Sequence, residues 1–157
     1  MTIQPLNIDQ LQTTFTEQNL GQVLSPEPNI VVTGAIAPSV IDALKQAGIN
    51  VVINVQPASE LTFDEQSAIE QAGMSYVNIP VSGADDLTEA TINQFDQAMT
   101  QYASQNMLLH CKSGNRVGAI VALQAGLLQG YSAVDAVQRG KDFGLLALEP
   151  VVAQRLG

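Results

Sequence analysis

The sequence has few of the residues that usually mark a structural metal site or a disulfide. Its 157 residues include one cysteine, one histidine and no tryptophan. A single cysteine cannot form an internal disulfide, and one cysteine with one histidine has no recognisable zinc-binding spacing. We therefore expect no disulfide framework, no metal site and no bound cofactor.

Positive charge and long apolar runs are also scarce. Six Lys and Arg residues stand against 15 Asp and Glu residues, and the formal net charge is −9. This balance argues against the basic surface that nucleic-acid-binding proteins present to phosphates. No apolar run approaches the length of a membrane span. We expect neither nucleic acid nor a membrane as a partner, and no pattern predicts the oligomeric state.

Length and composition are those of a globular protein. With 46% hydrophobic and 13% charged residues, the 157 residues fit one domain. We expect that domain to span 1–157, with the Gln-rich segment 1–29 as its least readable part. The start, MTIQPLNIDQ, lacks the basic and apolar regions of a signal peptide. This favours a cytoplasmic location, whereas a periplasmic one would require that a signal peptide had been removed.

Short apolar runs alternate with helical patterns along the chain. Strands are predicted at residues 30–34, 49–55, 74–81 and 107–110. Helices are predicted at about 38–47, 63–72, 88–105 and 115–129, followed by two more that begin near Ser132 and Pro150. Strands that alternate with helices predict an α/β fold, with a mostly parallel central sheet flanked by helices.

The cysteine and the histidine stand together in LLHCKSGNRVGAI, residues 108–120. A strand ends here and a helix begins, which is where ligands bind in open α/β sheets. A loop glycine lets the backbone turn its N–H groups inward, and the helix N-terminus adds partial positive charge. A tetrahedral oxyanion fits such a loop. The predicted oxyanion-binding residues are Lys112, Ser113, Gly114, Asn115 and Arg116.

Cys111 is predicted to be a thiolate nucleophile in this setting, because Arg116 and the helix N-terminus favour its charged form. For His110 we favour an indirect role, in which it orients the loop through hydrogen bonds. Taken alone, each residue has a structural alternative: a lone Cys is commonly a small buried apolar residue, and a lone His a packing residue. The combination of both with a loop glycine and an arginine favours a reactive site.

At these residues the chain resembles the cysteine-dependent phosphatases with the dual-specificity fold, and more closely the beta-lactamase hydrolase-like phosphatase family. The likeness covers VVTGAIAPSVIDALKQAGINVVINVQP, YVNIPVSGADDLTEATINQF and HCKSGNRVGAIVAL. It implies hydrolysis of phosphate monoesters without a metal, on a small anionic substrate or a phosphorylated protein. Cys111 would attack phosphorus, the loop amides and Arg116 would hold the equatorial oxygens, and an Asp would protonate the leaving oxygen.

Three features differ from the phosphatase pattern. Four residues, rather than five, separate the cysteine from the arginine of the loop. Val117 stands where the family usually has Ser or Thr. When the acid loop is aligned by its proline, Gly83 falls where the Asp is expected, and Asp85 and Asp86 lie just beyond it as candidate general acids.

The shorter loop resembles that of rhodanese-type sulfurtransferases, often written Cys-x-x-Gly-x-Arg, which hold a persulfide on the cysteine. Sulfur transfer needs no general acid of the phosphatase kind. A third alternative is an inactive oxyanion-binding module that keeps the loop and Arg116 but leaves Cys111 unreactive. We rank phosphate-ester hydrolysis first, as a weak or atypical activity, because the rest of the chain resembles phosphatases.

Overall fold

A computed structural model describes residues 4–157. It has the predicted α/β architecture, with one five-stranded sheet of order β1-β2-β5-β3-β4. Only the β1–β2 pair is antiparallel, and the other three pairs are parallel. The strands are β1 (Leu24–Glu27), β2 (Ile30–Thr33), β3 (Val51–Asn54), β4 (Ser75–Asn78) and β5 (Met107–His110).

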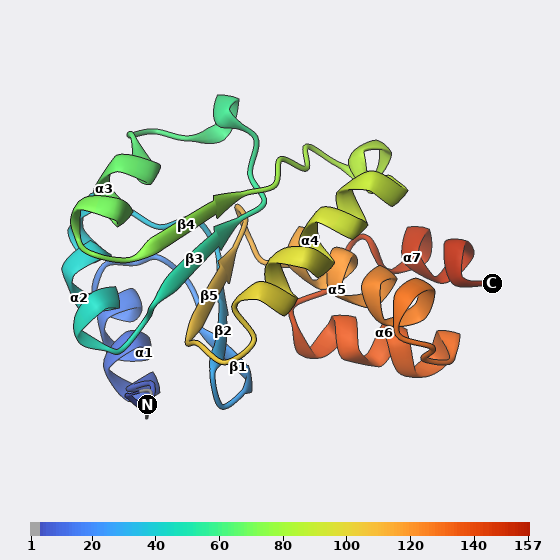
Figure 1. The fold of residues 1–157 in the computed structure, drawn as a ribbon, viewed down its shortest axis with the longest axis horizontal. Coiled ribbons are helices and arrows are strands. Elements are labelled where there is room, and N and C mark those ends of the chain that lie inside the picture. The colour runs from blue at the N-terminus through green and yellow to red at the C-terminus, as the bar shows by residue number, and fades with distance from the viewer. Residues whose placement is uncertain (1–3) are drawn as a thin grey trace.

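Helices cover both faces of the sheet. In Figure 1, α1 to α3 lie on one side of the sheet and α4 to α7 on the other. The helices are α1 (Ile8–Glu17), α2 (Ile41–Gln46), α3 (Glu65–Gln71), α4 (Glu89–Gln101), α5 (Asn115–Leu128), α6 (Ala133–Asp142) and α7 (Glu149–Leu156). Short 3₁₀ turns are η1 (Pro38–Val40), η2 (Ala58–Glu60) and η3 (Ala84–Asp86). Within residues 4–157, no helix combines the length and the apolar character needed to cross a membrane.

The sheet separates two apolar cores. Because alternate side chains of a strand point to opposite faces, Leu108 of β5 packs with α1 to α3, while Met107 and Leu109 pack with α4 to α7. Every residue of β2, β3 and β5 is buried, as expected for parallel strands covered on both faces. Since β5 lies between β2 and β3, the chain that leaves its carboxyl end emerges at the centre of the sheet.

Three of the predicted helix ends have local causes that the structure confirms. The Thr88 hydroxyl accepts a hydrogen bond from the Thr91 amide at the start of α4, and Ser132 caps α6 in the same way. Gly48 follows α2 with φ +103°, a left-handed conformation that glycine adopts without steric cost.

The N-terminal segment contains two elements that the sequence pattern did not predict, α1 and β1. Helix α1 buries Leu11 and Phe15 in the core beside α2. Strand β1 has only four residues, including Pro26, and its register with β2 is irregular. Proline and partial exposure are typical of edge strands and leave no alternating pattern in the sequence.

Candidate active site

The loop between β5 and α5 places Cys111 at the carboxyl end of the central strand. Gly114 is the N-cap of α5 and has φ +87°, a backbone conformation that favours glycine. This turn brings the Gly114 N–H to the thiol, to which it donates at 2.9 Å. The side chain of Cys111 is fully buried. An N–H aimed at sulfur at the start of a helix stabilises negative charge on that atom.

Arg116 lies in the first turn of α5 and is held by a carboxylate from η2. Its Nη1 and Nη2 donate to the two carboxylate oxygens of Glu60 at 3.0 and 2.7 Å, and Nη1 also donates to the Val81 carbonyl at 2.6 Å. The hydrogen bond to Glu60 is the largest cause that raises the pKa of Arg116, and the charge of Cys111 adds to it. In turn, Arg116 lowers the pKa of Glu60 below its ordinary value.

The hydrogen bonds to Glu60 and Val81 leave one edge of the Arg116 guanidinium available. A guanidinium has five N–H donors in a fixed plane, and the contacts within residues 4–157 use three of them, on Nη1 and Nη2. The Nε–H and the second Nη2–H lie side by side along the remaining edge. Two parallel donors of this kind bind two oxygens of a phosphate or another oxyanion.

The remaining loop residues are tied to neighbouring segments. Lys112 and Ser113 have exposed side chains, while the Lys112 carbonyl accepts a hydrogen bond from the Ala35 amide at 3.2 Å. Gly34 lies so close that an added Cβ would be 2.7 Å from that carbonyl oxygen. The segment after β2 therefore supports one side of the loop.

Asn115 uses its side chain for structure. Its Oδ1 accepts hydrogen bonds from the backbone amides of Leu146 at 2.8 Å and Leu148 at 3.3 Å. These contacts attach the start of α5 to the connection between α6 and α7. Within the predicted oxyanion-binding set, Asn115 is therefore a candidate through its backbone N–H alone.

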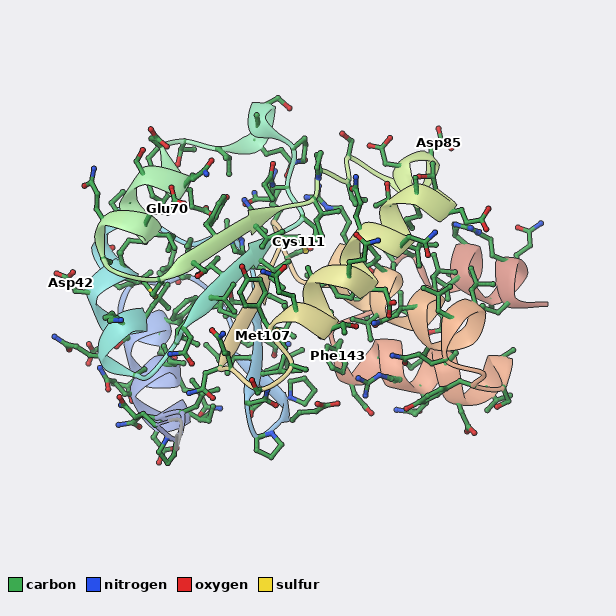
Figure 2. The ribbon with its side chains drawn as sticks, in the orientation of Figure 1. Asp42, Glu70, Asp85, Met107, Cys111 and Phe143 are labelled. Carbon is green, nitrogen blue, oxygen red and sulfur yellow. The ribbon has the colours of Figure 1, made fainter. Side chains whose placement is uncertain are left out.

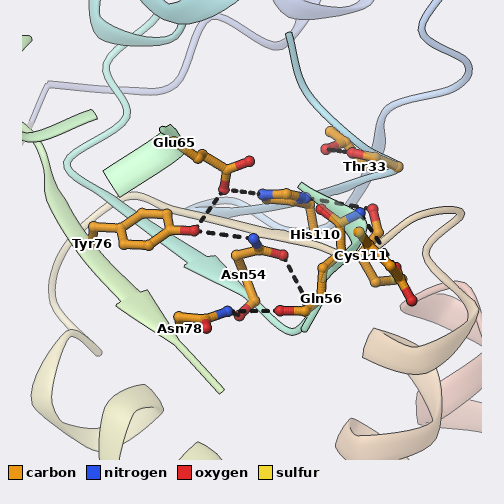
Figure 3. A network of polar contacts seen from close by, with 10 residues as sticks. Thr33, Asn54, Gln56, Glu65, Tyr76, Asn78, His110 and Cys111 are labelled. Carbon is orange, nitrogen blue, oxygen red and sulfur yellow. Dashed lines mark hydrogen bonds and ion pairs between the residues drawn. The ribbon is translucent and has the colours of Figure 1, made fainter. Parts of the chain in front are cut away.

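His110 joins a buried polar network beneath the loop (Figure 3). Its Nε2 lies 2.7 Å from Oε2 of Glu65, the first residue of α3, and its Nδ1 lies 3.4 Å from the Cys111 carbonyl oxygen. The Tyr76 hydroxyl donates to the same Glu65 oxygen at 2.9 Å and accepts from Asn54 Nδ2 at 3.0 Å. Burial raises the pKa of Tyr76 above its ordinary range, so this phenol remains protonated. The prediction that His110 orients the loop through hydrogen bonds remains a prediction, and its candidate partners are Glu65 and the Cys111 carbonyl.

The two candidate acids lie in η3, after β4. Asp86 accepts a hydrogen bond from the Ser82 amide at 2.8 Å and so stabilises its own loop. Asp85 is exposed, and Figure 2 shows it at the far end of the η3–α4 segment, well apart from Cys111. The structure thus brings His110, Cys111 and Arg116 together and leaves Asp85 away from them.

Two carboxylates of the site, Glu60 and Glu65, were not among the residues predicted from the sequence. Both belong to the segment that follows β3, and they contact residues 56 and 45 positions away in the chain. Glu65 is 1% exposed, and its burial could not be read from a polar stretch. Within the described chain, no group of three or more His, Cys, Asp or Glu side chains is arranged to hold a metal ion.

Comparison with known proteins assigns the chain to a family. Residues 23–127 match the phosphatase-like domain of beta-lactamase hydrolase-like proteins. The chain belongs to this family. The beta-lactamase hydrolase-like protein of Agrobacterium fabrum (strain C58) is 34% identical over 120 residues, which are 72% of this chain and 27% of that protein. This chain therefore spans little more than a quarter of that family member's length.

Solved structures agree with the family assignment. A protein from Shewanella putrefaciens CN-32, described as a putative phosphatase, is similar with a TM-score of 0.70 and 25% identity, covering 96% of both chains. TpbA of P. aeruginosa, whose structure was determined in complex with phosphotyrosine, has a TM-score of 0.60 and 18% identity over 82% of this chain and 78% of its own. At that identity the likeness concerns the fold alone. The chain is thus a phosphatase-like domain with the fold of tyrosine phosphatases.

Proposed function

We propose that the protein hydrolyses phosphate monoesters, with Cys111 as the nucleophile and Arg116 as the cation that binds the phosphoryl group. The observation that carries this proposal is the loop at the end of β5. There the Gly114 N–H lies 2.9 Å from the thiol sulfur, and Arg116, in the next turn, keeps two parallel N–H donors beyond those that hold it to Glu60. Membership of a phosphatase-like family supports the same chemistry.

The reaction proceeds in two displacements. The Cys111 thiolate attacks phosphorus and forms the S–P bond, while the bond from phosphorus to the ester oxygen breaks and its electron pair leaves with that oxygen. Water then attacks phosphorus, the S–P bond breaks, and inorganic phosphate and the thiolate are released. The loop amides of residues 112–116 and the free edge of Arg116 stabilise the equatorial oxygens in both steps.

The leaving oxygen needs a proton, and its source sets the expected substrate range. Asp85 lies away from Cys111, and Asp86 is engaged with Ser82. Since neither candidate acid is directed at the thiol, we propose that the leaving group takes its proton from water. Aryl esters with weakly basic leaving oxygens are then hydrolysed better than alkyl esters, and the activity is weak by the standard of this fold.

Sulfur transfer is the second candidate, favoured by the length of the loop. Four residues separate Cys111 from Arg116, as in the rhodanese-type loop, and no acid is required. In that reaction the Cys111 thiolate attacks the outer sulfur of thiosulfate, the sulfur–sulfur bond breaks, and sulfite leaves with the electron pair. The resulting persulfide then passes its outer sulfur to a nucleophile such as cyanide.

One preparation tests both candidates. Initial rates are measured with p-nitrophenyl phosphate and, separately, with thiosulfate and cyanide, using Cys111→Ser as the control. Hydrolysis of the aryl phosphate that is lost in Cys111→Ser supports the proposal. If the aryl phosphate is not hydrolysed, and mass spectrometry detects an added sulfur atom on Cys111 after thiosulfate treatment, the protein is a sulfurtransferase.

Loop length supplies a second discriminating variant. Inserting one glycine after Gly114 restores the spacing of the phosphatase motif and should raise turnover of p-nitrophenyl phosphate, because a displacement of about 1 Å can change a rate by about a hundredfold. The same insertion should weaken persulfide formation at Cys111. If the native protein already hydrolyses phosphotyrosine efficiently and the insertion only abolishes activity, the short loop is a competent phosphatase loop.

A further inference from the structure

A cavity of about 280 Å³ lies at the end of the sheet opposite the cysteine loop. It opens where β2 and β5 begin, and α4, α5 and α6 contribute the rest of its wall. In Figure 2, Met107 lies at the start of β5, whereas Cys111 follows the end of that strand. The volume is close to that of pockets that bind small molecules. A molecule bound here would therefore leave the cysteine loop accessible.

Gln124 of α5 supplies this cavity with a buried hydrogen-bond acceptor. The residue lines the cavity and is 3% exposed. Its Nε2 donates to Asp96 Oδ1 at 2.9 Å, and because a carboxylate oxygen accepts, this contact fixes which end of the amide is the nitrogen. Oε1 is the other end, and no donor within residues 4–157 contacts it. A buried polar atom of this kind needs a partner from outside the chain, either water or a ligand.

Arg139 of α6 supplies hydrogen-bond donors to the same cavity. Its Nη1 donates to Glu27 Oε1 at 2.9 Å, and its guanidinium carbon lies 4.8 Å from the centre of the Phe143 ring. Its Nε is buried and finds no acceptor in the described part of the chain. The Nε–H and one Nη2–H lie side by side along the edge that the contact with Glu27 does not use. Arg139 therefore keeps two parallel donors.

Charge and apolar surface narrow the kind of ligand further. Glu27 and Arg139 form an ion pair, so their charges offset each other and favour a neutral ligand. Ile30, Met99 and Met107 form the apolar part of the wall. Methionine sulfur makes favourable contacts with aromatic rings. These features suit a flat, neutral ring system with polar edges.

We propose that this cavity binds a neutral 6-oxopurine base, free or as its nucleoside. Such a base has two acceptors side by side, O6 and N7, which match the two parallel donors of an arginine. Its N1–H is a donor for Gln124 Oε1. When the base binds, the Arg139 guanidinium rotates and turns its buried Nε–H toward the cavity. The site does not involve Cys111, so the proposal is independent of the function proposed for that residue.

The methionines of the chain allow a direct test on the wild-type protein. Met99 and Met107 line the cavity, whereas Met74 packs in the core on the other face of the sheet. The methionine methyl groups are labelled with ¹³C, and their NMR signals are followed during titration with inosine. We expect saturable shifts of the Met99 and Met107 signals with a Kd below about 1 mM, and no shift of Met74. If Met99 and Met107 do not respond, the cavity holds water alone and the proposal is wrong.

Analogues of inosine test the hydrogen bonds of the base. 1-Methylinosine lacks the N1–H donor, and adenosine has an amino group in place of the O6 acceptor. Each should bind about tenfold more weakly than inosine, because one buried group loses its partner. Equal affinity for all three nucleosides overturns the assignment of the base. Tighter binding of inosine 5′-monophosphate than of inosine would show that the cavity selects an anion, which also contradicts the proposal.

A matched pair of variants tests the role of Gln124. Gln124→Met keeps the size of the side chain and removes the acceptor, so inosine should bind about tenfold more weakly. Asp96→Asn keeps an acceptor for Gln124 Nε2 and leaves Oε1 unchanged, so its affinity should stay close to that of the wild type. Equal losses in the two variants would contradict the argument. Near-ultraviolet circular dichroism checks that both variants are folded, and the wild-type titration decides the proposal if Gln124→Met is not.

Discussion

Gly118 of α5 is a position where the surrounding backbone leaves no room for a side chain. An added Cβ at this residue would lie 2.1 Å from the Leu145 nitrogen, 2.5 Å from the Leu145 Cα and 2.6 Å from the Gly140 carbonyl oxygen. All three are backbone atoms, so no change of side-chain rotamer can relieve the overlap. In Gly118→Ala the segment around Leu145 must therefore move away from α5.

The cost can be assembled from the contacts that this movement disturbs. Overpacking in a close-packed interior costs about 1–3 kcal/mol and sometimes more. The displaced segment also carries the amides of Leu146 and Leu148, which donate to Asn115, at about 1 kcal/mol each. Replacing a helical glycine by alanine returns about 1 kcal/mol. The net destabilisation is about 2–4 kcal/mol, which for a chain of this size lowers Tm by roughly 10 °C.

Gly126→Ala on the same helix is the matched control. There the added Cβ would meet the Cδ atoms of Leu156 at 2.5 and 3.1 Å, and the end of a leucine side chain near the C-terminus can rotate away. Both variants gain the same helix propensity, so the difference between them isolates the backbone overlap. Thermal unfolding followed by circular dichroism measures it. If Gly118→Ala melts within about 2 °C of the wild type, or Gly126→Ala is the less stable of the two, the packing argument is refuted.

Two further predictions concern the acid loop and pH. Asp85→Asn should lower turnover of p-nitrophenyl phosphate and phenyl phosphate by the same small factor, below about threefold, because Asp85 lies apart from Cys111; a loss at least tenfold larger for the phenyl ester would identify Asp85 as the general acid. Arg116 holds the pKa of Glu60 below its ordinary value of 4.5, so the stability from this pair is present above that pH and is lost as pH falls through the lowered value. Between pH 6 and pH 3 the Tm of Glu60→Gln should therefore fall less than the Tm of the wild type. The difference corresponds to about 1 kcal/mol or less, because the pair is partly exposed. An equal fall in Tm in the two proteins would contradict this.

The parts of the fold that could be predicted are those that depend only on residues close together in the sequence, such as strand-forming apolar runs and helix caps. Runs such as Val51 to Val55 are buried on both faces of the sheet, and their β-branched residues predict strands without further context. Caps such as Ser132 and glycines such as Gly48 set helix ends from neighbouring residues alone. Strand β1 follows no such rule, because it contains Pro26 and exists through its pairing with β2.

The candidate site divides in the same way. His110, Cys111 and Arg116 are close in the chain, so their proximity in space could be predicted, while their roles remain predictions. Glu60 and Glu65 lie far from these residues in the chain, and the pairing of β3 with β5 brings them close in space. An acidic residue in the first turn of a helix is common for reasons of helix stability, so Glu65 at the start of α3 carries no sign in the sequence of its contact with His110.

The strand order has a consequence for how this protein and its relatives can change. The cysteine loop follows β5, which has a neighbour on each side, whereas the η3 loop follows β4, which lies at the edge of the sheet. An insertion or deletion after β4 has no strand beyond it to displace, while one after β5 must be accommodated on both sides. Lineages can therefore gain, lose or lengthen the loop that follows β4 while the cysteine loop stays fixed. Differences in reaction type among such proteins should accumulate at residues 80–87 before they reach the loop that contains Cys111.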